Sequence, residues 1–177
     1  MKQLFNHIQQ YVTISDDEFT EISQYFEKLS VGRKQELHAP QSQCNTIFFT
    51  IKGSLHLYFI DDRGTERTVQ FAIENWWIGD FLAFYNQSKT DFYVKSIEAA
   101  DVLGISYENH EKLLQDFPKL ESYFRQIYQI TYGSFLFRMK HVYSFSKEEL
   151  YLNFTHHFPQ FSERIPQYLI ASYLGLT

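Results

Sequence analysis

The feature that most constrains the fold is a change in the periodicity of the apolar residues along the chain. From Arg33 onward, apolar and polar residues alternate with a period of two in short segments rich in Phe, Tyr, Ile, Val and Thr, a pattern typical of strands. The predicted strands are residues 46–52, 54–60, 67–73, 92–98 and 101–105. Short strands at this regular spacing predict an antiparallel β-roll or jelly roll.

Turn residues and composition support this interpretation. Gly53 separates the first two predicted strands, and Asp61, Asp62, Arg63 and Gly64 supply residues that tolerate positive φ in a hairpin turn. The 18 Phe and 13 Tyr residues suit a β-rich body whose faces pack large rings.

Helical periodicity precedes the β region. The first predicted helix carries Leu4, Phe5, Ile8 and Tyr11 on one face. Ser15 and Glu18 have the spacing of a capping box and predict the start of a second helix. That second helix is expected to present Phe19, Ile22, Phe26 and Leu29 on one face.

After Ser106 the helical pattern returns, and Pro118 opens a stretch to about Tyr143 that contains no internal proline. A helix of about 25 residues spans nearly 40 Å, which is longer than the β body alone could cover. Its apolar residues spread more widely than a coiled-coil seam, so one side can face the β body and another a partner subunit. The residues predicted for dimerisation are Leu120, Phe124, Ile127, Ile130 and Phe137. The alternative is a helix that merely lies on its own core.

A second capping box, Ser146 with Glu149, opens a helix that ends before Pro159, and another short helix follows Pro166. The tail then has the pattern of the first half of a helix-turn-helix. That motif needs a small residue where two helices cross, a glycine four positions later for the left-handed turn, and a Ser or Thr that caps the next helix. The residues predicted for this DNA-binding motif are Gln167, Ala171, Gly175 and Thr177. An ordinary capped helix is the alternative.

Charge and cysteine content exclude other classes. The net charge of −5 argues against a surface that binds phosphate backbone everywhere, so any DNA-reading element is local or missing. A single cysteine, Cys44, cannot form an internal disulfide, which favours a reducing cytoplasm. The sequence shows neither a signal-peptide core nor the roughly 20 apolar residues needed to cross a bilayer. We therefore expect a cytoplasmic protein without a membrane partner.

The order of β-roll, long helix and small helical segment resembles the Crp/Fnr family of transcription regulators across nearly the whole chain. The segment from Phe71 to Asp80, F-x-x-E-N-W-W-x-x-D, resembles one branch of that family, and so does the tail from Pro166 to Gly175. The resemblance implies an α+β fold: a cyclic-nucleotide-binding-like β-roll with N-terminal helices, a long dimerisation helix and an incomplete helix-turn-helix domain.

The resemblance also implies a division of the chain and a set of partners. Residues 1–117 form the sensor, 118–145 the dimerisation helix, and 146–177 the start of a winged helix-turn-helix domain without its recognition helix. We expect this polypeptide not to read DNA sequence itself, because the base contacts belong to the recognition helix. The intact protein is expected to be a homodimer that binds DNA and is controlled by an unknown small-molecule effector. The alternative is a sensor module that binds a cyclic nucleotide or acts through protein partners, without DNA.

The sequence does not favour cyclic-nucleotide binding. In family members that bind cyclic AMP, a Gly-Glu pair holds the ribose and a later Arg-Ser pair holds the phosphate. Here Gly79 and Asp80 stand in for the first pair, with Asp in place of Glu. Thr90 and Asp91 fall where Arg-Ser is expected, and a carboxylate repels phosphate. Lys89 and Lys95 are nearby substitutes. The residues predicted for an effector pocket are Trp76, Trp77, Gly79, Asp80, Leu82, Lys89, Thr90 and Asp91. For the two tryptophans, structural packing is the alternative.

We predict no catalytic or metal-binding residues and no cofactor, so the chain is not expected to be an enzyme. The enzyme alternative is a cupin, a jelly roll that holds a metal with clustered His and Glu side chains. The seven histidines show no H-x-H or H-E-x-x-H spacing, and only His56 falls in a predicted core strand.

Overall fold

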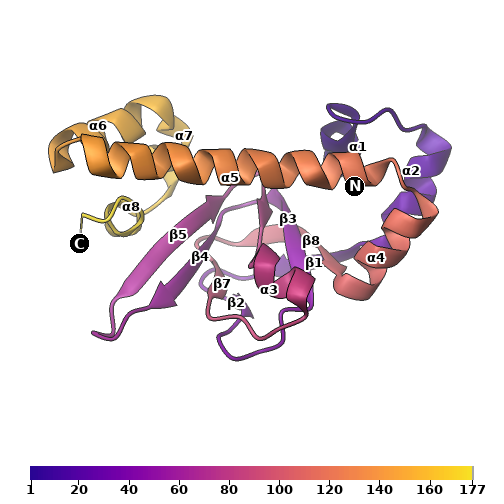
Figure 1. Ribbon diagram of the computed structural model, residues 1–177, viewed down its shortest axis with the longest axis horizontal. Coiled ribbons are helices and arrows are strands. Elements are labelled where there is room, and N and C mark those ends of the chain that lie inside the picture. Colours follow the sequence, from indigo (N-terminus) through magenta and orange to yellow (C-terminus); the bar gives the residue numbers. More distant parts are fainter. Residues whose placement is uncertain (177) are drawn as a thin grey trace.

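A computed structural model, which describes residues 1–176, has the predicted α+β architecture, with an antiparallel β-roll flanked by helices (Figure 1). The roll consists of two four-stranded sheets with the strand orders β1-β8-β3-β6 and β2-β7-β4-β5. The strands are β1 (Glu27–Val31), β2 (Glu36–His38), β3 (Thr46–Lys52), β4 (Leu55–Ile60), β5 (Glu66–Ala72), β6 (Trp77–Ile78), β7 (Tyr93–Ser96) and β8 (Ala100–Ser106).

Helices precede and follow the roll, and one short helix interrupts it. They are α1 (Lys2–Gln9), α2 (Asp16–Ile22), the 3₁₀ helix η1 (Ser23–Tyr25), α3 (Phe81–Asn86), α4 (Tyr107–Asp116), α5 (Leu120–Ser144), α6 (Lys147–His157), α7 (Pro159–Arg164) and α8 (Gln167–Tyr173). The long helix α5 crosses over the roll, and α6, α7 and α8 lie near its C-terminal end (Figure 1). None of the helices in residues 1–176 combines the length and apolar character needed to cross a membrane.

The interior of the roll is filled by apolar side chains from both sheets, because alternate residues of each strand point inward. This cluster comprises Val31, Phe48, Leu55, Leu57, Ala72, Ile78, Val94, Ala100 and Val102. A second cluster lies on the outer face of the first sheet, where Ile47, Phe49, Leu103 and Ile105 meet residues of α1, α2, α4 and the start of α5. The helices therefore cover one face of the roll.

A third cluster joins the C-terminal helices to the roll. Phe71, Ile73 and Ile97 of the roll pack with residues of α6, α7, α8 and the segments between them. The residues from the helical side are Leu150, Phe154, Phe161, Ile165, Leu169, Ile170 and Leu174. The segment beyond residue 145 thus shares its core with the roll.

Several local predictions are confirmed. Both capping boxes form, with Ser15 and Glu18 at the start of α2 and Ser146 and Glu149 at the start of α6. Gly53 has φ +92, and an added Cβ would lie 2.5 Å from the carbonyl oxygen of Ala99. Only glycine fits this turn between β3 and β4.

Other predictions are wrong. Leu29, predicted to lie on a helical face, is in β1 and pairs with Val102 of β8. The short elements β1, β2, β6, η1, α3 and α7 were not predicted, because they are too brief to show a clear period. His56 is in β4 as predicted, but His38 also lies in a strand, β2.

Candidate functional site

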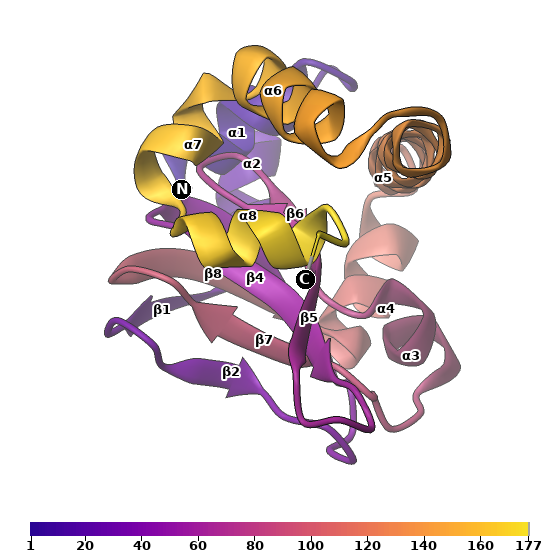
Figure 2. The ribbon, with the colours of Figure 1, turned by 90° about the vertical axis from the view of Figure 1, so that its left-hand side faces the viewer.

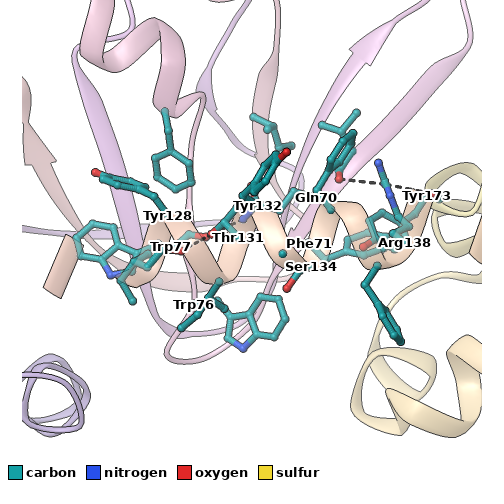
Figure 3. A pocket seen from close by; sticks show the side chains of 18 of the residues that line it. Gln70, Phe71, Trp76, Trp77, Tyr128, Thr131, Tyr132, Ser134, Arg138 and Tyr173 are labelled. Atoms are coloured by element: carbon teal, nitrogen blue, oxygen red, sulfur yellow. Dashed lines mark hydrogen bonds between the residues drawn. The ribbon is translucent and has the colours of Figure 1, made fainter. Parts of the chain in front are cut away.

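A cavity of about 1260 Å³ lies between α5, the roll and the C-terminal helices (Figure 3). Leu57 and Phe71 of the roll, Ile127 of α5 and Phe161 of α7 contribute to its mostly apolar and aromatic wall. In the view turned by 90°, α5 is seen along its axis, apart from α8, which lies against β4 and β5 (Figure 2). The cavity is thus shared by three parts of the chain.

The structure places five of the eight predicted effector-pocket residues at this cavity: Trp76, Trp77, Gly79, Asp80 and Leu82. Both tryptophans also have packing roles. Trp77 is buried, and its ring centroid lies 5.5 Å from that of Phe124 in α5, while Trp76 lies 5.5 Å from Phe161 in α7. These two side chains therefore connect the roll to the helices on either side.

Asp80 and Thr90, both predicted for the effector pocket, are hydrogen-bonded to each other. The Thr90 hydroxyl donates to Asp80 Oδ2 at 2.8 Å, and the backbone N–H of Ala83 donates to Asp80 Oδ1 at 3.1 Å. Thr90 is buried and does not line the cavity. The carboxylate is thus used to cap α3 and to hold the following loop.

The remaining predicted residues, Lys89 and Asp91, are exposed and lie away from the cavity. The side-chain amide of Gln41 donates to Asp91 Oδ1 at 3.1 Å. Lys95 does not line the cavity either. Its Nζ lies 3.8 Å from a carboxylate oxygen of Glu36. Neither lysine that could replace the family's phosphate-binding arginine reaches the cavity.

A buried hydrogen-bonded group that the sequence did not reveal lies beside the cavity. Trp77 Nε1–H donates to the Tyr123 hydroxyl at 2.8 Å, and the same hydroxyl lies 2.8 Å from Nδ1 of His7. Because the tyrosine oxygen accepts from Trp77, its own proton is available to a neutral His7 Nδ1. Burial lowers the pKa of His7 and raises that of Tyr123, so both groups are held neutral. This group fastens α1, β6 and α5 together.

Arg138 of α5 is the single Lys or Arg among the residues that line the cavity. Its Nη1 donates to the carbonyl oxygens of Val69 at 3.1 Å and Tyr173 at 3.2 Å. The guanidinium lies 4.4 Å from the centre of the Tyr173 ring. Arg138 therefore bridges β5 and the end of α8, and Figure 3 shows it beside Tyr173 at one end of the cavity.

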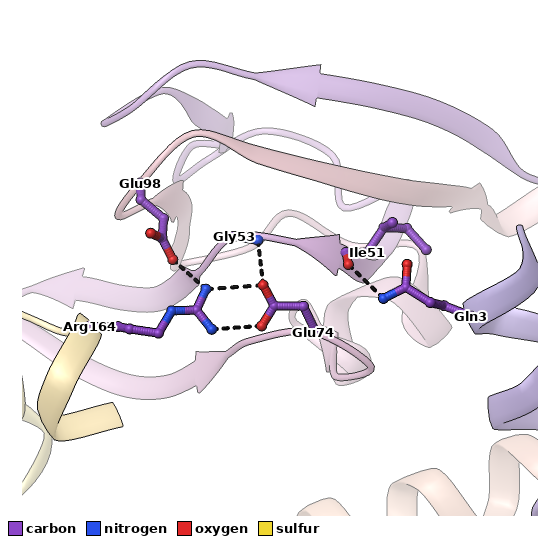
Figure 4. Close-up of polar contacts among 6 residues, drawn as sticks. All are labelled: Gln3, Ile51, Gly53, Glu74, Glu98 and Arg164. Atoms are coloured by element: carbon purple, nitrogen blue, oxygen red, sulfur yellow. Dashed lines mark hydrogen bonds and ion pairs between the residues drawn. The ribbon is translucent and has the colours of Figure 1, made fainter. Parts of the chain in front are cut away.

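An ion-pair group connects α7 to the roll (Figure 4). Arg164 donates to both carboxylate oxygens of Glu74, at 2.7 and 3.1 Å, and to Glu98 at 2.5 Å. Glu74 also accepts from the Gly53 N–H at 2.8 Å. Burial alone would raise the pKa of Glu74, but the hydrogen bonds from Arg164 and the backbone lower it overall.

The predicted DNA-binding residues lie at the C-terminal end. Gln167 begins α8, Ala171 is within it, and Gly175 follows it with φ +71. The N–H of Gly175 donates to the carbonyl oxygen of Ser172 at 3.1 Å, and the N–H of Leu176 donates to the carbonyl oxygen of Ala171 at 2.9 Å. This is the Schellman arrangement of a helix end. Thr177 lies outside the described residues.

The edge of the roll is also fastened to α8. The Ser172 hydroxyl accepts from the N–H of Thr68 at 3.0 Å and donates to the carbonyl of Glu66 at 2.8 Å. Because β5 is the last strand of its sheet, these backbone groups would otherwise lack a strand partner. The side of the tail that carries Ser172 is thus packed against the roll.

The residues predicted for dimerisation divide into two sets. Leu120, Phe124 and Ile127 are buried in the chain's own core and are not available to a partner. Ile130 and Phe137 are 51% and 50% exposed. Further apolar side chains are exposed on the same half of α5, namely Tyr132, Phe135, Leu136 and Tyr143.

Among residues 1–176 no group of three or more His, Cys, Asp or Glu side chains could hold a metal ion. His56 lies in β4 between Leu55 and Leu57, whose side chains fill the roll interior, so its ring belongs to the opposite face of the sheet. There it stacks on Tyr58. Burial lowers the pKa of His56 to about 4.

Comparison with known proteins was made by sequence and by structure. Neither a family model nor a curated protein sequence matches the chain. A cyclic nucleotide-binding domain from Methylobacillus flagellatus matches with a TM-score of 0.63 at 13% identity, over 79% of each chain. The c-di-GMP responsive global regulator CLP of Xanthomonas campestris has a TM-score of 0.62 at 13% identity, over 74% of this chain and 66% of CLP.

The Catabolite Activator Protein of Thermus thermophilus matches with a TM-score of 0.58 at 13% identity, over 77% of this chain. This chain covers 65% of that protein, so it spans about two thirds of its length. At such identities the likeness establishes the fold. The chain therefore has the β-roll fold found in cyclic nucleotide-binding domains and in transcription regulators.

Proposed function

We propose that the chain is the sensor and dimerisation part of a one-component transcription regulator of the Crp/Fnr type. The observation that carries this proposal is the arrangement around α5. The N-terminal half of α5 is buried against the roll, and its C-terminal half exposes apolar side chains. The helices that follow α5 end in a Schellman turn at Gly175. The F-x-x-E-N-W-W-x-x-D segment adds sequence support for the same family.

The exposed half of α5 favours a homodimer. Leu136 and Tyr143 are 48% and 83% exposed, do not line the cavity and lie seven residues apart on one face of α5. Exposed apolar side chains on one face are typical of an interaction site. Two copies of α5 that pack side by side would bury this face and would place the two C-terminal segments on the same side of the dimer.

Sedimentation equilibrium tests the dimer. We expect the wild-type chain to be dimeric at micromolar concentration, and Leu136→Glu with Tyr143→Glu, neither of which lines the cavity, to weaken dimerisation by about a hundredfold or more. The control is Leu152→Glu, since Leu152 is similarly exposed but lies on α6. A monomeric wild-type protein would contradict the dimer.

The C-terminal helices favour DNA as the target of the intact regulator. Gly175 makes the turn that a following recognition helix requires, and dimer symmetry predicts two half-sites roughly 34 Å apart. Crosslinking of the gene product to DNA in its native host should enrich such paired sites. Recovery of a protein partner without enriched DNA would favour the partner-binding sensor instead.

The effector of this regulator is not expected to be a cyclic nucleotide. The Asp80 carboxylate is occupied by Thr90 and Ala83, and Lys89 lies away from the cavity. Thermal melts with millimolar cyclic AMP and cyclic GMP should show no shift of the midpoint, because only a ligand that binds the native state raises it. A clear rise with either compound would overturn this expectation.

A further inference from the structure

The wall of the cavity indicates what kind of ligand body it accepts. Rings and aliphatic side chains from the roll, α5 and α7 supply most of the lining, including Phe71, Trp77, Ile127 and Phe161. Pockets of this composition hold apolar or aromatic molecules and orient them with a small number of polar groups.

The charged groups of the cavity lie far apart. Arg138 is the single Lys or Arg among the lining residues, and Asp80 is the single carboxylate. Asp80 is the N-cap residue of α3. The ring of Phe81, the first residue of α3, lies 5.1 Å from the ring of Tyr128 in α5. The ten residues from Tyr128 to Arg138 correspond to about 15 Å of helix. A ligand with a negative group therefore finds a cation at the Arg138 end without an opposing carboxylate beside it.

The present partners of Arg138 are weak competitors for an anion. Both of its hydrogen bonds come from Nη1 and go to uncharged carbonyl oxygens, of Val69 and Tyr173. A guanidinium has five N–H donors in a planar fork. It binds a carboxylate or sulfonate through paired, charge-assisted hydrogen bonds that are roughly twice as strong as bonds to neutral groups.

The two carbonyls stand on opposite sides of the junction between the roll and the tail. Val69 is in β5, and Tyr173 is the last residue of α8. Arg138 comes from the third element, α5. A single side chain therefore lines the cavity and also fastens the C-terminal helix to the edge of the roll.

We propose that the cavity binds an aromatic carboxylate or sulfonate, that Arg138 pairs with its negative group, and that this pairing weakens the attachment of α8 to β5. The proposal rests on the proposed sensor function and specifies both the chemical class of its effector and the contact through which the effector acts. When an anion draws the guanidinium away from the two carbonyls, the contacts within residues 1–176 that still hold α8 to β5 are those of Ser172 and the apolar cluster. Occupancy of the cavity is thereby communicated to the C-terminal helices.

Two fluorescent probes with the same aromatic body test the ligand class on the full chain. 1-Anilinonaphthalene-8-sulfonate carries a negative group, and N-phenyl-1-naphthylamine lacks it. We expect the wild-type protein to bind the sulfonate at least about tenfold more tightly than the neutral amine, a difference that needs no variant to measure. Equal binding of both probes would overturn the proposal while leaving a ligand-binding cavity. Binding of neither probe would instead count against the proposed sensor function.

Substitution of the arginine locates the site. We expect Arg138→Gln to weaken sulfonate binding by about tenfold and to leave binding of the neutral amine unchanged. Arg138→Lys should recover part of the loss, because it keeps the charge without the planar fork. The matched control is Arg125→Gln, since Arg125 is exposed on the same helix and does not line this cavity. Unchanged sulfonate binding in both Arg138 variants would overturn the role of Arg138.

Hydrogen exchange tests the weaker attachment of α8. The sulfonate should increase the exchange of the amides of Gln167–Tyr173, whereas the neutral probe should not. The same increase should occur without any ligand in Arg138→Gln, because the bridge is then absent. Undiminished protection of α8 in the sulfonate-bound wild-type protein would overturn the coupling between the cavity and the tail.

Discussion

The two halves of α5 belong to one helix but lie in different surroundings. Tyr123, Phe124 and Ile127 in the N-terminal half are buried against the roll and the first helices. In the C-terminal half, Ile130 and Phe137 are half exposed, and the helix reaches the roll through Arg138 and through the α6–α8 segment. The same stretch of sequence therefore provides both a part of the core and a free surface.

This difference bears on how the two regions open. Elements with many buried apolar contacts open only with the whole domain, while elements held by few polar contacts open locally at lower cost. The N-terminal half of α5 is of the first kind. The C-terminal half and the helices that follow it are joined to the roll by one apolar cluster and by the polar bonds of Arg138, Arg164 and Ser172. Loss of one of these polar bonds should therefore affect this region more than the N-terminal half.

The largest expected effect is a difference in stability between substitutions in the two halves of α5. Phe124→Ala should lower the free energy of unfolding by about 3–5 kcal/mol, because it leaves a cavity in the core. Phe137→Ala should cost less than about 1 kcal/mol within one chain, because the side chain is already half exposed. Urea denaturation at several protein concentrations separates this intrachain cost from the loss of dimer contacts. Equal intrachain losses would show that the two halves do not differ.

Acid should destabilise the contacts of the N-terminal half of α5 through His7. Burial lowers the pKa of His7 below its usual 6.5, so protonation is easier in the unfolded chain than beside Tyr123. The stabilising contribution is therefore complete above about pH 6.5 and is lost as the pH falls through the lowered value. Unfolding free energies measured from pH 8 to pH 5 should fall, and His7→Gln should reduce that dependence. An unchanged pH dependence in this variant would contradict the neutral His7 contact.

Local sequence signals predicted the elements that local chemistry decides. The β3 strand was predicted with its observed bounds because its residues Thr46–Lys52 are a continuous apolar and β-branched run. The capping boxes at Ser15 and Ser146 were predicted because their partners lie three residues away. Leu29 was misplaced because its spacing from Phe26 fits a helix, whereas its strand is fixed by pairing with β8, a contact that local propensity does not contain.

The site was predictable only in part, for the same reason. Residues near one another in sequence, such as Trp76, Trp77 and Gly79, were placed together by the family pattern and do line the cavity. Arg138 and Arg164 were missed. Their partners are 35 to 90 residues away, and an arginine in a helical sequence gives no sign of what it will contact. The hydrogen bonds of Arg138, Arg164 and Ser172 that attach the tail to the roll all join residues far apart in the sequence.

The smallest expected effect concerns the ion pairs of Arg164. Its side chain and that of Glu74 are each 30% exposed, so solvent screens the pair and Arg164→Gln should cost at most about 1 kcal/mol of global stability. Local exchange should respond more clearly, with a few-fold loss of amide protection in α7 and α8 and little change in the N-terminal half of α5. Arg125→Gln, at an exposed position of α5, serves as the control. An equal drop in amide protection in the tail and in the N-terminal half of α5 would mean that the tail opens only with the whole molecule. The two halves of α5 would then differ in solvent exposure but not in local stability.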